Sequence, residues 1–244
     1  MEKRLFTIEN NEKLAETVRG LTLTGDTGAL VRPGQFVNLA LEGFYLRRPI
    51  SVCDLEGDKL TLVYKTVGKG TEKLAAMKKG ERLDLLTGLG NGFDTGKSGP
   101  RPLLVGGGAG APPLYLLAKR LLEEGKSPRL ILGFKTAREV FLENAFRALG
   151  CAVLVTTADG SYAAKGFVTD ALDRCGAYDY CFACGPEPML RAVYTRCGTD
   201  GQFSFEARMG CGFGACMGCT CRTKYGHKRI CRDGPVLEKG EIVW

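Results

Sequence analysis

The first part of the chain alternates short apolar segments with turn-forming residues, a pattern typical of antiparallel β-structure. Segments that alternate, or are rich in β-branched and aromatic residues, lie at 7–9, 15–18, 21–23, 35–40 and 60–65. Turn signals separate them, among them Gly25, Pro33-Gly34, Glu56-Gly57-Asp58 and Lys79-Gly80. Many short strands with such turns predict a small antiparallel β-barrel over residues 1–98. One short helix is expected at 71–77, with Thr71 as its N-cap.

Beyond residue 98 the pattern changes to continuous apolar runs that alternate with helical segments. Runs at 101–105, 129–134, 152–157 and 178–183 have the length of buried strands, and helices are expected at 112–122, near 140–149 and near 168–174. Strands and helices that alternate in this way build a doubly wound parallel sheet. The sequence therefore predicts an α/β nucleotide domain over residues 99–202, with ligands at the carboxyl ends of its strands.

One of these strand ends carries a glycine-rich turn that leads into a helix. Gly106, Gly108 and Ala111 fit the G-x-G-x-x-A fingerprint of a dinucleotide site. Two prolines follow at 112 and 113, where a first helical turn needs no backbone N–H. The strand–turn–helix context strengthens a fingerprint that is weak by itself.

Two other strand ends bear on the nucleotide. Cys184-Gly185-Pro186 ends one strand and begins a helix, so it is a second candidate contact. The acid that usually follows the second strand of the fingerprint is missing, and Lys135 and Arg138 lie there instead. A cofactor with a 2′-phosphate therefore stays open.

Cysteines dominate the C-terminal segment. Cys211, Cys216 and Cys219 have the C-x4-C-x2-C spacing of a plant-type 2Fe–2S cluster. Cys231 is the expected fourth ligand, because a hairpin turn at 224–227 would return it to the cluster, whereas Cys221 lies only two residues beyond Cys219. Zinc is the less favoured alternative, since zinc ribbons carry two short cysteine pairs, and a disulfide knot is less favoured still. The segment predicts a small 2Fe–2S module over residues 203–244.

A further candidate site lies at Arg48-Pro49-Ile50-Ser51. Arg48 offers a fork of donors, Pro49 stiffens the backbone and Ser51 adds a hydroxyl, a set that suits a diphosphate and the edge of a ring. The alternative is an ordinary turn before a strand. Downstream, the glycine-rich stretch at 67–71 leads into the expected helix, and it is either a phosphate site or an ordinary capped loop.

Composition narrows the classes of protein. The 244 residues, 44% hydrophobic and 25% charged, are those of a globular protein with room for two domains. The net charge of +7 comes from scattered side chains without a basic stripe, so no nucleic-acid binding is expected. No secretory signal or membrane span is found, and eleven cysteines in a cytoplasmic chain indicate redox or metal chemistry. His227, the only histidine, is expected to be an exposed turn residue.

These pieces, in this order, resemble the ferredoxin–NADP reductase superfamily. More closely, the whole chain resembles the family of electron-transfer subunits of NAD-dependent dihydroorotate dehydrogenase. The most specific segments are 46–51, 209–219 and 231–236. The fold implied is multi-domain, β plus α/β: an antiparallel flavin barrel, a doubly wound nucleotide domain and the 2Fe–2S module.

The resemblance implies three cofactors, FAD, NAD and a 2Fe–2S cluster. FAD would be bound between the barrel and the nucleotide domain by Arg48, Pro49, Ile50, Ser51, Val63, Tyr64, Lys65, Gly70 and Thr71. NAD would be bound through Gly106, Gly108, Ala111, Cys184, Gly185 and Pro186. The cluster would be held by Cys211, Cys216, Cys219 and Cys231. The superfamily usually has an aromatic residue where Ile50 stands, which leaves open what stacks on the flavin.

In such enzymes electrons pass from dihydroorotate to FMN in a catalytic partner subunit, and then through 2Fe–2S and FAD to NAD, in pyrimidine biosynthesis. The family implies a heterotetramer with that partner, and Met209, Phe213 and Met217 on the rim of the cysteine loop are the expected docking face unless they pack internally. No catalytic acid or base is expected in this chain, because the cofactors carry the chemistry. The alternatives are a related reductase subunit serving ferredoxin, hydrogenase or sulfite reduction, and a non-enzymatic iron–sulfur redox sensor.

Overall fold

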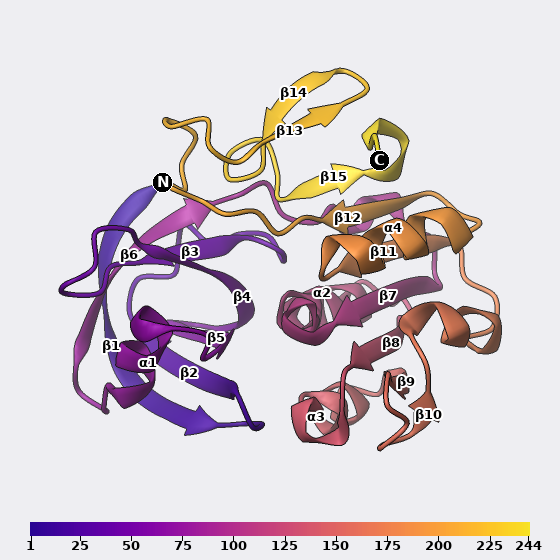
Figure 1. The fold of residues 1–244 in the computed structure, drawn as a ribbon, viewed down its shortest axis with the longest axis horizontal. Coiled ribbons are helices and arrows are strands. Elements are labelled where there is room, and N and C mark those ends of the chain that lie inside the picture. Colours follow the sequence, from indigo (N-terminus) through magenta and orange to yellow (C-terminus); the bar gives the residue numbers. More distant parts are fainter.

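The N-terminal strands close into an antiparallel barrel, as the sequence predicts. The computed structural model describes residues 1–244, and the barrel forms the indigo-to-purple lobe of Figure 1. Its strands, in the order β1-β2-β5-β4-β3-β6, are β1 (Glu2–Lys13), β2 (Val18–Thr24), β5 (Lys59–Lys65), β4 (Arg48–Glu56), β3 (Phe36–Leu39) and β6 (Arg82–Leu89). Burial alternates along β6, where Leu83 and Leu85 face the barrel core. This period of two is what closes a barrel around an apolar core.

Two local predictions for the barrel are wrong. The helix α1 runs over Lys69–Ala76 with Gly68 as its N-cap, so Thr71 lies three residues inside it. The Thr71 hydroxyl accepts from the backbone N–H groups of Val67 and Gly68, at 2.9 and 3.2 Å, and so serves the turn before the helix. The strand expected at 15–18 begins only at Val18, because residues 14–18 form a tight turn.

The second lobe is a seven-stranded sheet in the order β10-β9-β8-β7-β11-β12-β15. Its strands are β7 (Pro102–Gly107), β8 (Arg129–Phe134), β9 (Ala152–Thr157), β10 (Ala164–Lys165), β11 (Tyr180–Cys184), β12 (Gly201–Ser204) and β15 (Val236–Glu238). All neighbouring pairs are parallel except β12 and β15. The parallel α/β prediction is confirmed.

The helices of this lobe are α2 (Ala111–Glu123), α3 (Glu143–Ala148) and α4 (Glu187–Arg196), with short 3-10 helices η1 (Thr95–Lys97), η2 (Gly108–Gly110), η3 (Ala137–Glu139), η4 (Val168–Arg174) and η5 (Lys239–Glu241). The helix expected near 140–149 starts late because Leu142 adopts a left-handed φ of 62°. The segment at 168–174 is helical but of the 3-10 type. No helix combines the length and apolar character needed to cross a membrane.

The C-terminal segment forms a separate hairpin and then adds a strand to the nucleotide sheet. The hairpin β13 (Thr220–Thr223) and β14 (Gly226–Arg229) projects at the top of Figure 1, and β15 then returns to the edge of the nucleotide sheet beside β12. The expected boundary between residues 202 and 203 thus falls inside β12. His227 was expected within the turn at 224–227, but the turn is formed by Lys224 and Tyr225 alone, so His227 lies in β14; it is exposed as expected.

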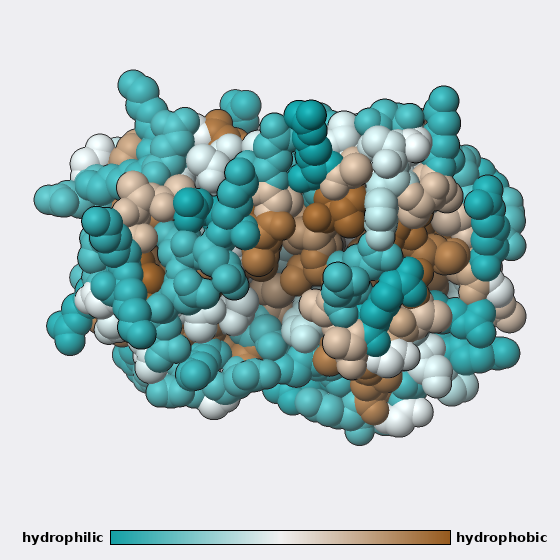
Figure 2. Space-filling model, turned by 90° about the horizontal axis from the view of Figure 1, so that it is seen from below, coloured by the Kyte–Doolittle hydropathy of each residue, from teal (hydrophilic) through white to brown (hydrophobic).

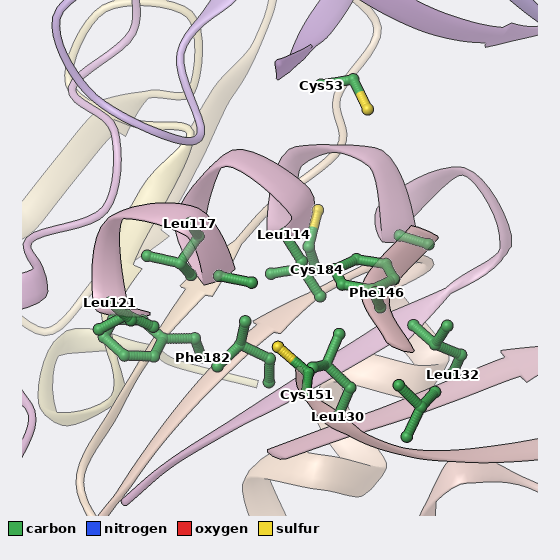
Figure 3. Packing of buried hydrophobic residues seen from close by; sticks show 14 of the residues in the cluster. Cys53, Leu114, Leu117, Leu121, Leu130, Leu132, Phe146, Cys151, Phe182 and Cys184 are labelled. Carbon is green, nitrogen blue, oxygen red and sulfur yellow. The ribbon is translucent and has the colours of Figure 1, made fainter. Parts of the chain in front are cut away.

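Helix α2 lies between the two lobes. Figure 3 shows Leu114, Leu117 and Leu121 pointing to the sheet, where Phe182 is buried, while Cys53 of β4 lies on the other side of the helix. These residues belong to one buried cluster, so the barrel and the sheet share a core through α2. A shared apolar core resists relative motion of the two lobes.

An ion pair fixes the same junction. Lys119 of α2 contacts Asp54 of β4 with Nζ–Oδ1 and Nζ–Oδ2 distances of 2.8 and 2.9 Å, and Glu56 at 3.1 Å. The Lys119 and Asp54 side chains are only 19% and 14% exposed, so solvent screens the pair weakly.

We predict that Lys119→Met destabilises the chain by about 2 kcal/mol, since it leaves the nearly buried Asp54 carboxylate without its partner. Arg120→Met is the matched control on the same helix, because Arg120 pairs with Glu123 at the open surface, 46% and 56% exposed, and such pairs contribute about 0.5 kcal/mol or less. Thermal unfolding of both variants checks this, and equal losses would contradict the junction argument.

Candidate functional site

A first cavity, of about 270 Å³, lies where the barrel meets the nucleotide domain. Six residues predicted to contact the flavin line it, namely Pro49, Ile50, Ser51, Val63, Tyr64 and Lys65. The opposite wall includes Cys184 at the end of β11, together with Phe205 and Met209 from the segment that leads to the cysteine loop. Phe36 and Phe205 supply aromatic rings in this wall, so Ile50 is not the only side chain that can face a flat ring.

Arg48, Gly70 and Thr71 are not among the residues that line this cavity. Arg48 directly precedes Pro49, which lines it, and packs against Gly70 at the start of α1. A Cβ on Gly70 would lie 2.5 Å from Arg48 Nε, so only glycine lets the guanidinium rest against the helix terminus. The guanidinium also stacks on Phe44, with Cζ 4.7 Å from the ring centroid, and contacts the Leu46 carbonyl. An arginine held at a helix N-terminus is a site for a phosphate or diphosphate.

The residues around the first cavity fit FAD. They combine apolar walls for a flat ring with a cationic anchor for its diphosphate, which is the composition expected of a cofactor site. FAD supplies the conversion between the two-electron chemistry of a nicotinamide and the one-electron chemistry of a cluster.

A second cavity, of about 640 Å³, opens at the carboxyl ends of β7, β8 and β9. Gly107 and Gly108 of the fingerprint line it, as do Lys135 after β8 and Pro186 at the start of α4. Lys65, Ala109 and Glu206 line both cavities, so the two are continuous. Figure 2, which views the molecule from below, shows apolar surface gathered near the middle of that face with hydrophilic surface around it.

The other fingerprint residues act through packing. Gly106 and Ala111 do not line the cavity; a Cβ on Gly106 would lie 3.2 Å from the Ala111 Cα. A Cβ on Gly110 would lie 2.0 Å from the Cys184 carbonyl oxygen. Gly185, with φ of 153°, passes close to Gly107. These glycines bring two strand ends together, which gives a dinucleotide close access to both.

Two acidic residues of the site were missed by the sequence reasoning. Glu139 in η3 lines the second cavity and pairs with Lys65, with Nζ–Oε2 of 3.4 Å, whereas Arg138 is 80% exposed and reaches Glu16 at 3.9 Å. An acid therefore follows the second strand after all, four residues further on than Lys135. Glu139 directly follows Arg138 and lies just before the helix expected near 140–149, so no strand-end pattern singled it out.

Glu206, the second missed acid, lies between the cavities. Burial raises the pKa of its carboxyl, and the Lys65 ammonium opposes the rise. It follows β12 by two residues, at the carboxyl end of a strand, which is where a sheet of this kind places its functional side chains.

The predicted cluster cysteines lie together in two pairs. In the first pair, the N–H of Cys211 donates to Cys216 Sγ at 3.5 Å, and the N–H groups of Ala215 and Cys216 donate to Cys211 Sγ at 3.2 and 3.4 Å. In the second pair, the N–H of Cys231 donates to Cys219 Sγ at 3.4 Å. Backbone N–H groups that face sulfur stabilise thiolates and tune a cluster.

The thiol pKa values follow from this geometry. Burial tends to raise the pKa of Cys211, but the N–H groups of Cys216, Phe213 and Ala215 and the Cys216 thiol outweigh it and lower the pKa to about 6. Burial, together with the hydrogen bond and charge of Cys219, raises the pKa of Cys231 to about 12.

The two pairs fit a 2Fe–2S cluster better than a single metal ion. Structural zinc would require all four ligands to converge on one point. A cluster of two irons instead takes two thiolates on each iron, which matches the pairs Cys211–Cys216 and Cys219–Cys231. Cys221 lies in β13 opposite Lys228, and burial raises the pKa of its thiol. A 2Fe–2S cluster supplies one-electron transfer.

A flavin barrel, a parallel nucleotide sheet and a thiol loop together define a flavin-dependent iron–sulfur reductase. Residues 206–243 match a family model described as the iron-sulfur cluster binding domain of dihydroorotate dehydrogenase B. A Bacillus mycoides protein named dihydroorotate dehydrogenase B (NAD(+)), electron transfer subunit, is 43% identical, covering 100% of this chain and 99% of that protein. The Bacillus velezensis protein of the same name is 41% identical, with full coverage of both. The chain belongs to this family of electron transfer subunits.

Solved structures agree on the fold. The NADH-dependent reduced ferredoxin–NADP oxidoreductase, studied for flavin-based electron bifurcation, superposes with a TM-score of 0.89 at 32% identity, over 98% of this chain and 90% of its own. The flavohem-like FAD/NAD binding domain of nitric oxide dioxygenase from Vibrio cholerae has a TM-score of 0.71 at 20% identity, over 82% and 97%. The second likeness concerns the fold alone.

We predict that Arg48→Ala weakens FAD binding about a hundredfold with little loss of fold, since a charged donor to phosphate contributes about 2–3 kcal/mol. Arg47→Ala is the control, because Arg47 is occupied on the outer face of the barrel by the Asn38 and Asp84 carbonyls and the Asp84 carboxylate. Flavin titration of the apoprotein should separate the two. Unchanged affinity in Arg48→Ala would make that arginine structural only.

Proposed function

We propose that this chain carries electrons from the dihydroorotate-reduced FMN of a partner subunit, by way of 2Fe–2S and FAD, to NAD in pyrimidine biosynthesis. The observation that carries the proposal is the meeting of all three parts at one cavity, whose wall combines Ile50 of the barrel, Cys184 of the sheet and Met209 next to the cysteine loop. Family membership over the whole chain supports the same direction of electron flow.

In this proposal each part of the chain has one task. Residues 1–98 bind FAD, residues 99–202 bind NAD, and residues 203–244 hold the cluster. FAD is bound by Arg48, Pro49, Ile50, Ser51, Val63, Tyr64, Lys65, Gly70 and Thr71, and NAD by Gly106, Gly108, Ala111, Cys184, Gly185 and Pro186. The cluster ligands are Cys211, Cys216, Cys219 and Cys231.

The partner is an FMN-containing catalytic subunit, and we propose a heterotetramer with it in the cytoplasm, where free cysteines such as the eleven of this chain persist. Phe213 and Met217, 41% and 54% exposed on the cysteine loop, are the docking face. Met209 is partly buried and lines the flavin cavity, so in part it packs internally and supports docking less.

A second candidate is a reductase subunit serving ferredoxin. The observation that favours it is the likeness to the NADH-dependent reduced ferredoxin–NADP oxidoreductase, at 32% identity over 98% of this chain. Both functions need the same FAD, NAD and cluster sites, and they differ in the electron donor.

The ligand assignment predicts opposite results for two neighbouring thiols. Cys231→Ser should lose most of the bound iron, because one iron is left with a single thiolate. Cys221→Ser should keep its iron, since Cys221 lies in β13 and accepts no N–H from the cysteine loop. Iron and sulfide analysis after anaerobic reconstitution measures both, and the reverse pattern would mean that Cys221 is the ligand.

The donor is identified by mixing dihydroorotate anaerobically with the chain and following the flavin absorbance. Oxidation of dihydroorotate needs a binding site for that substrate and a base beside a flavin, and in this proposal FAD and NAD already take up both cavities. We predict no bleaching with the isolated chain and full bleaching once the FMN subunit is added. Bleaching without the partner would refute the subunit assignment, and bleaching only with reduced ferredoxin would favour the second candidate.

A further inference from the structure

Asn38 connects the flavin barrel to the cysteine loop. It lies in β3, is 1% exposed, and its Nδ2 donates to the backbone carbonyl of Cys211 at 3.1 Å. No other hydrogen bond runs from the barrel to residues 209–221. The first thiol of the loop is thus attached to the barrel through a single buried amide.

The loop is built to approach this amide closely. Gly212 follows Cys211 with φ of 78°, and a Cβ on it would lie 2.3 Å from Asn38 Nδ2. Any other residue would push the loop away from β3, so the glycine serves this contact as well as the turn.

On its other side Asn38 adjoins the flavin cavity. In the barrel it pairs with Pro49 of β4, and Pro49 lines that cavity. The Asn38 carbonyl accepts from Arg47 Nη1 at 3.1 Å, and Arg47 is bound in turn to Asp84 at 2.9 Å. Arg47 therefore holds β3, the strand that carries the amide, through the Asn38 backbone.

The Asn38 side chain also carries a buried polar atom that lowers the stability of the fold. Asn38 Oδ1 is buried and has no hydrogen-bond partner, and a buried acceptor without a partner is destabilising. The reversed amide would face the Cys211 carbonyl with an oxygen, so the donor orientation is the one that the loop requires. An apolar residue would avoid the cost but would lose the attachment.

We propose that Asn38 is a positioning residue that holds the Cys211–Gly212 segment against the barrel and thereby sets the distance between cluster and flavin. Asn91 is the corresponding attachment at the other end of the module, where Nδ2 donates to the Val236 carbonyl at 2.7 Å. The Asn91 bond and the pairing of β15 with β12 both attach the module after its last thiol, so without Asn38 no hydrogen bond from the barrel would hold the Cys211–Gly212 segment. Because electron transfer slows steeply with distance, the attachment at Asn38 governs transfer between the two cofactors. The assignment rests on the proposed cofactor sites, but not on the identity of the electron donor.

The test compares Asn38→Leu, which keeps the size and removes the donor, with Thr87→Val. The control removes a barrel hydrogen bond, from Thr87 Oγ1 to the Glu2 carbonyl at 3.3 Å, which joins β6 to β1 and makes no contact with the cysteine loop. In the metal-free chain, Asn38→Leu should speed amide hydrogen exchange over residues 209–217 and leave the rest of the barrel unchanged. Thr87→Val should leave exchange at 209–217 as in the parent.

In the reconstituted chain, NADH should reduce the flavin of Asn38→Leu at the parent rate. Cluster bleaching should then slow by about tenfold or more, the scale expected when reacting groups are misplaced by an ångström, with an altered cluster circular dichroism spectrum.

Gly212→Ala removes the same contact from the loop side and should give the same result. The double variant should bleach its cluster no more slowly than either single variant. If Asn38→Leu fails to fold, Gly212→Ala by itself tests whether this contact positions the cluster. Parent-like exchange and cluster bleaching in both variants would overturn the assignment. Loss of iron in the parent chain would instead count against the proposed function.

Discussion

Electrons pass between protein-bound cofactors only over short distances, and this constraint explains how the three parts of the chain are packed. The barrel, the nucleotide sheet and the cysteine loop each contribute to the wall of one cavity, through Ile50, Cys184 and Met209. Lys65 and Glu206 extend that wall into the nucleotide cavity. The proposed flavin site is thus formed where the three parts meet, and no single part contains it.

Holding such a junction requires rigid contacts between parts that are distant in the sequence. Helix α2 packs on the sheet with one face and on β4 with the other, and β15 returns from the cluster module to pair with β12. The two asparagines at positions 38 and 91 tie the two ends of the cluster module to the barrel side. Polar contacts at these places are directional, so they fix relative position as well as adding stability.

The fold class, a dinucleotide site and the 2Fe–2S cluster followed from local sequence signals, since strand alternation, the glycine turn and the C-x4-C-x2-C spacing each depend on neighbouring residues. FAD was implied by the resemblance to the reductase family. The features that escaped prediction depend on distant ones. Glu139 becomes a cavity residue only because η3 turns it toward Lys65 of the barrel. Thr71 was misplaced as an N-cap because a threonine at N3 also bonds the preceding turn. The pairing of β15 with β12, and the contact from Asn38 to Cys211 across 173 positions, leave no local pattern at all.

If one chain holds a flavin and a 2Fe–2S cluster close enough to share electrons, a nicotinamide that reduces the flavin should also reduce the cluster. Anaerobic titration of the isolated chain with NADH, followed by absorbance and electron paramagnetic resonance, tests it most directly. We expect the flavin to bleach and a reduced 2Fe–2S signal to rise to about one spin per chain. A flavin that bleaches while no iron signal forms, in a chain that carries stoichiometric zinc, would contradict it.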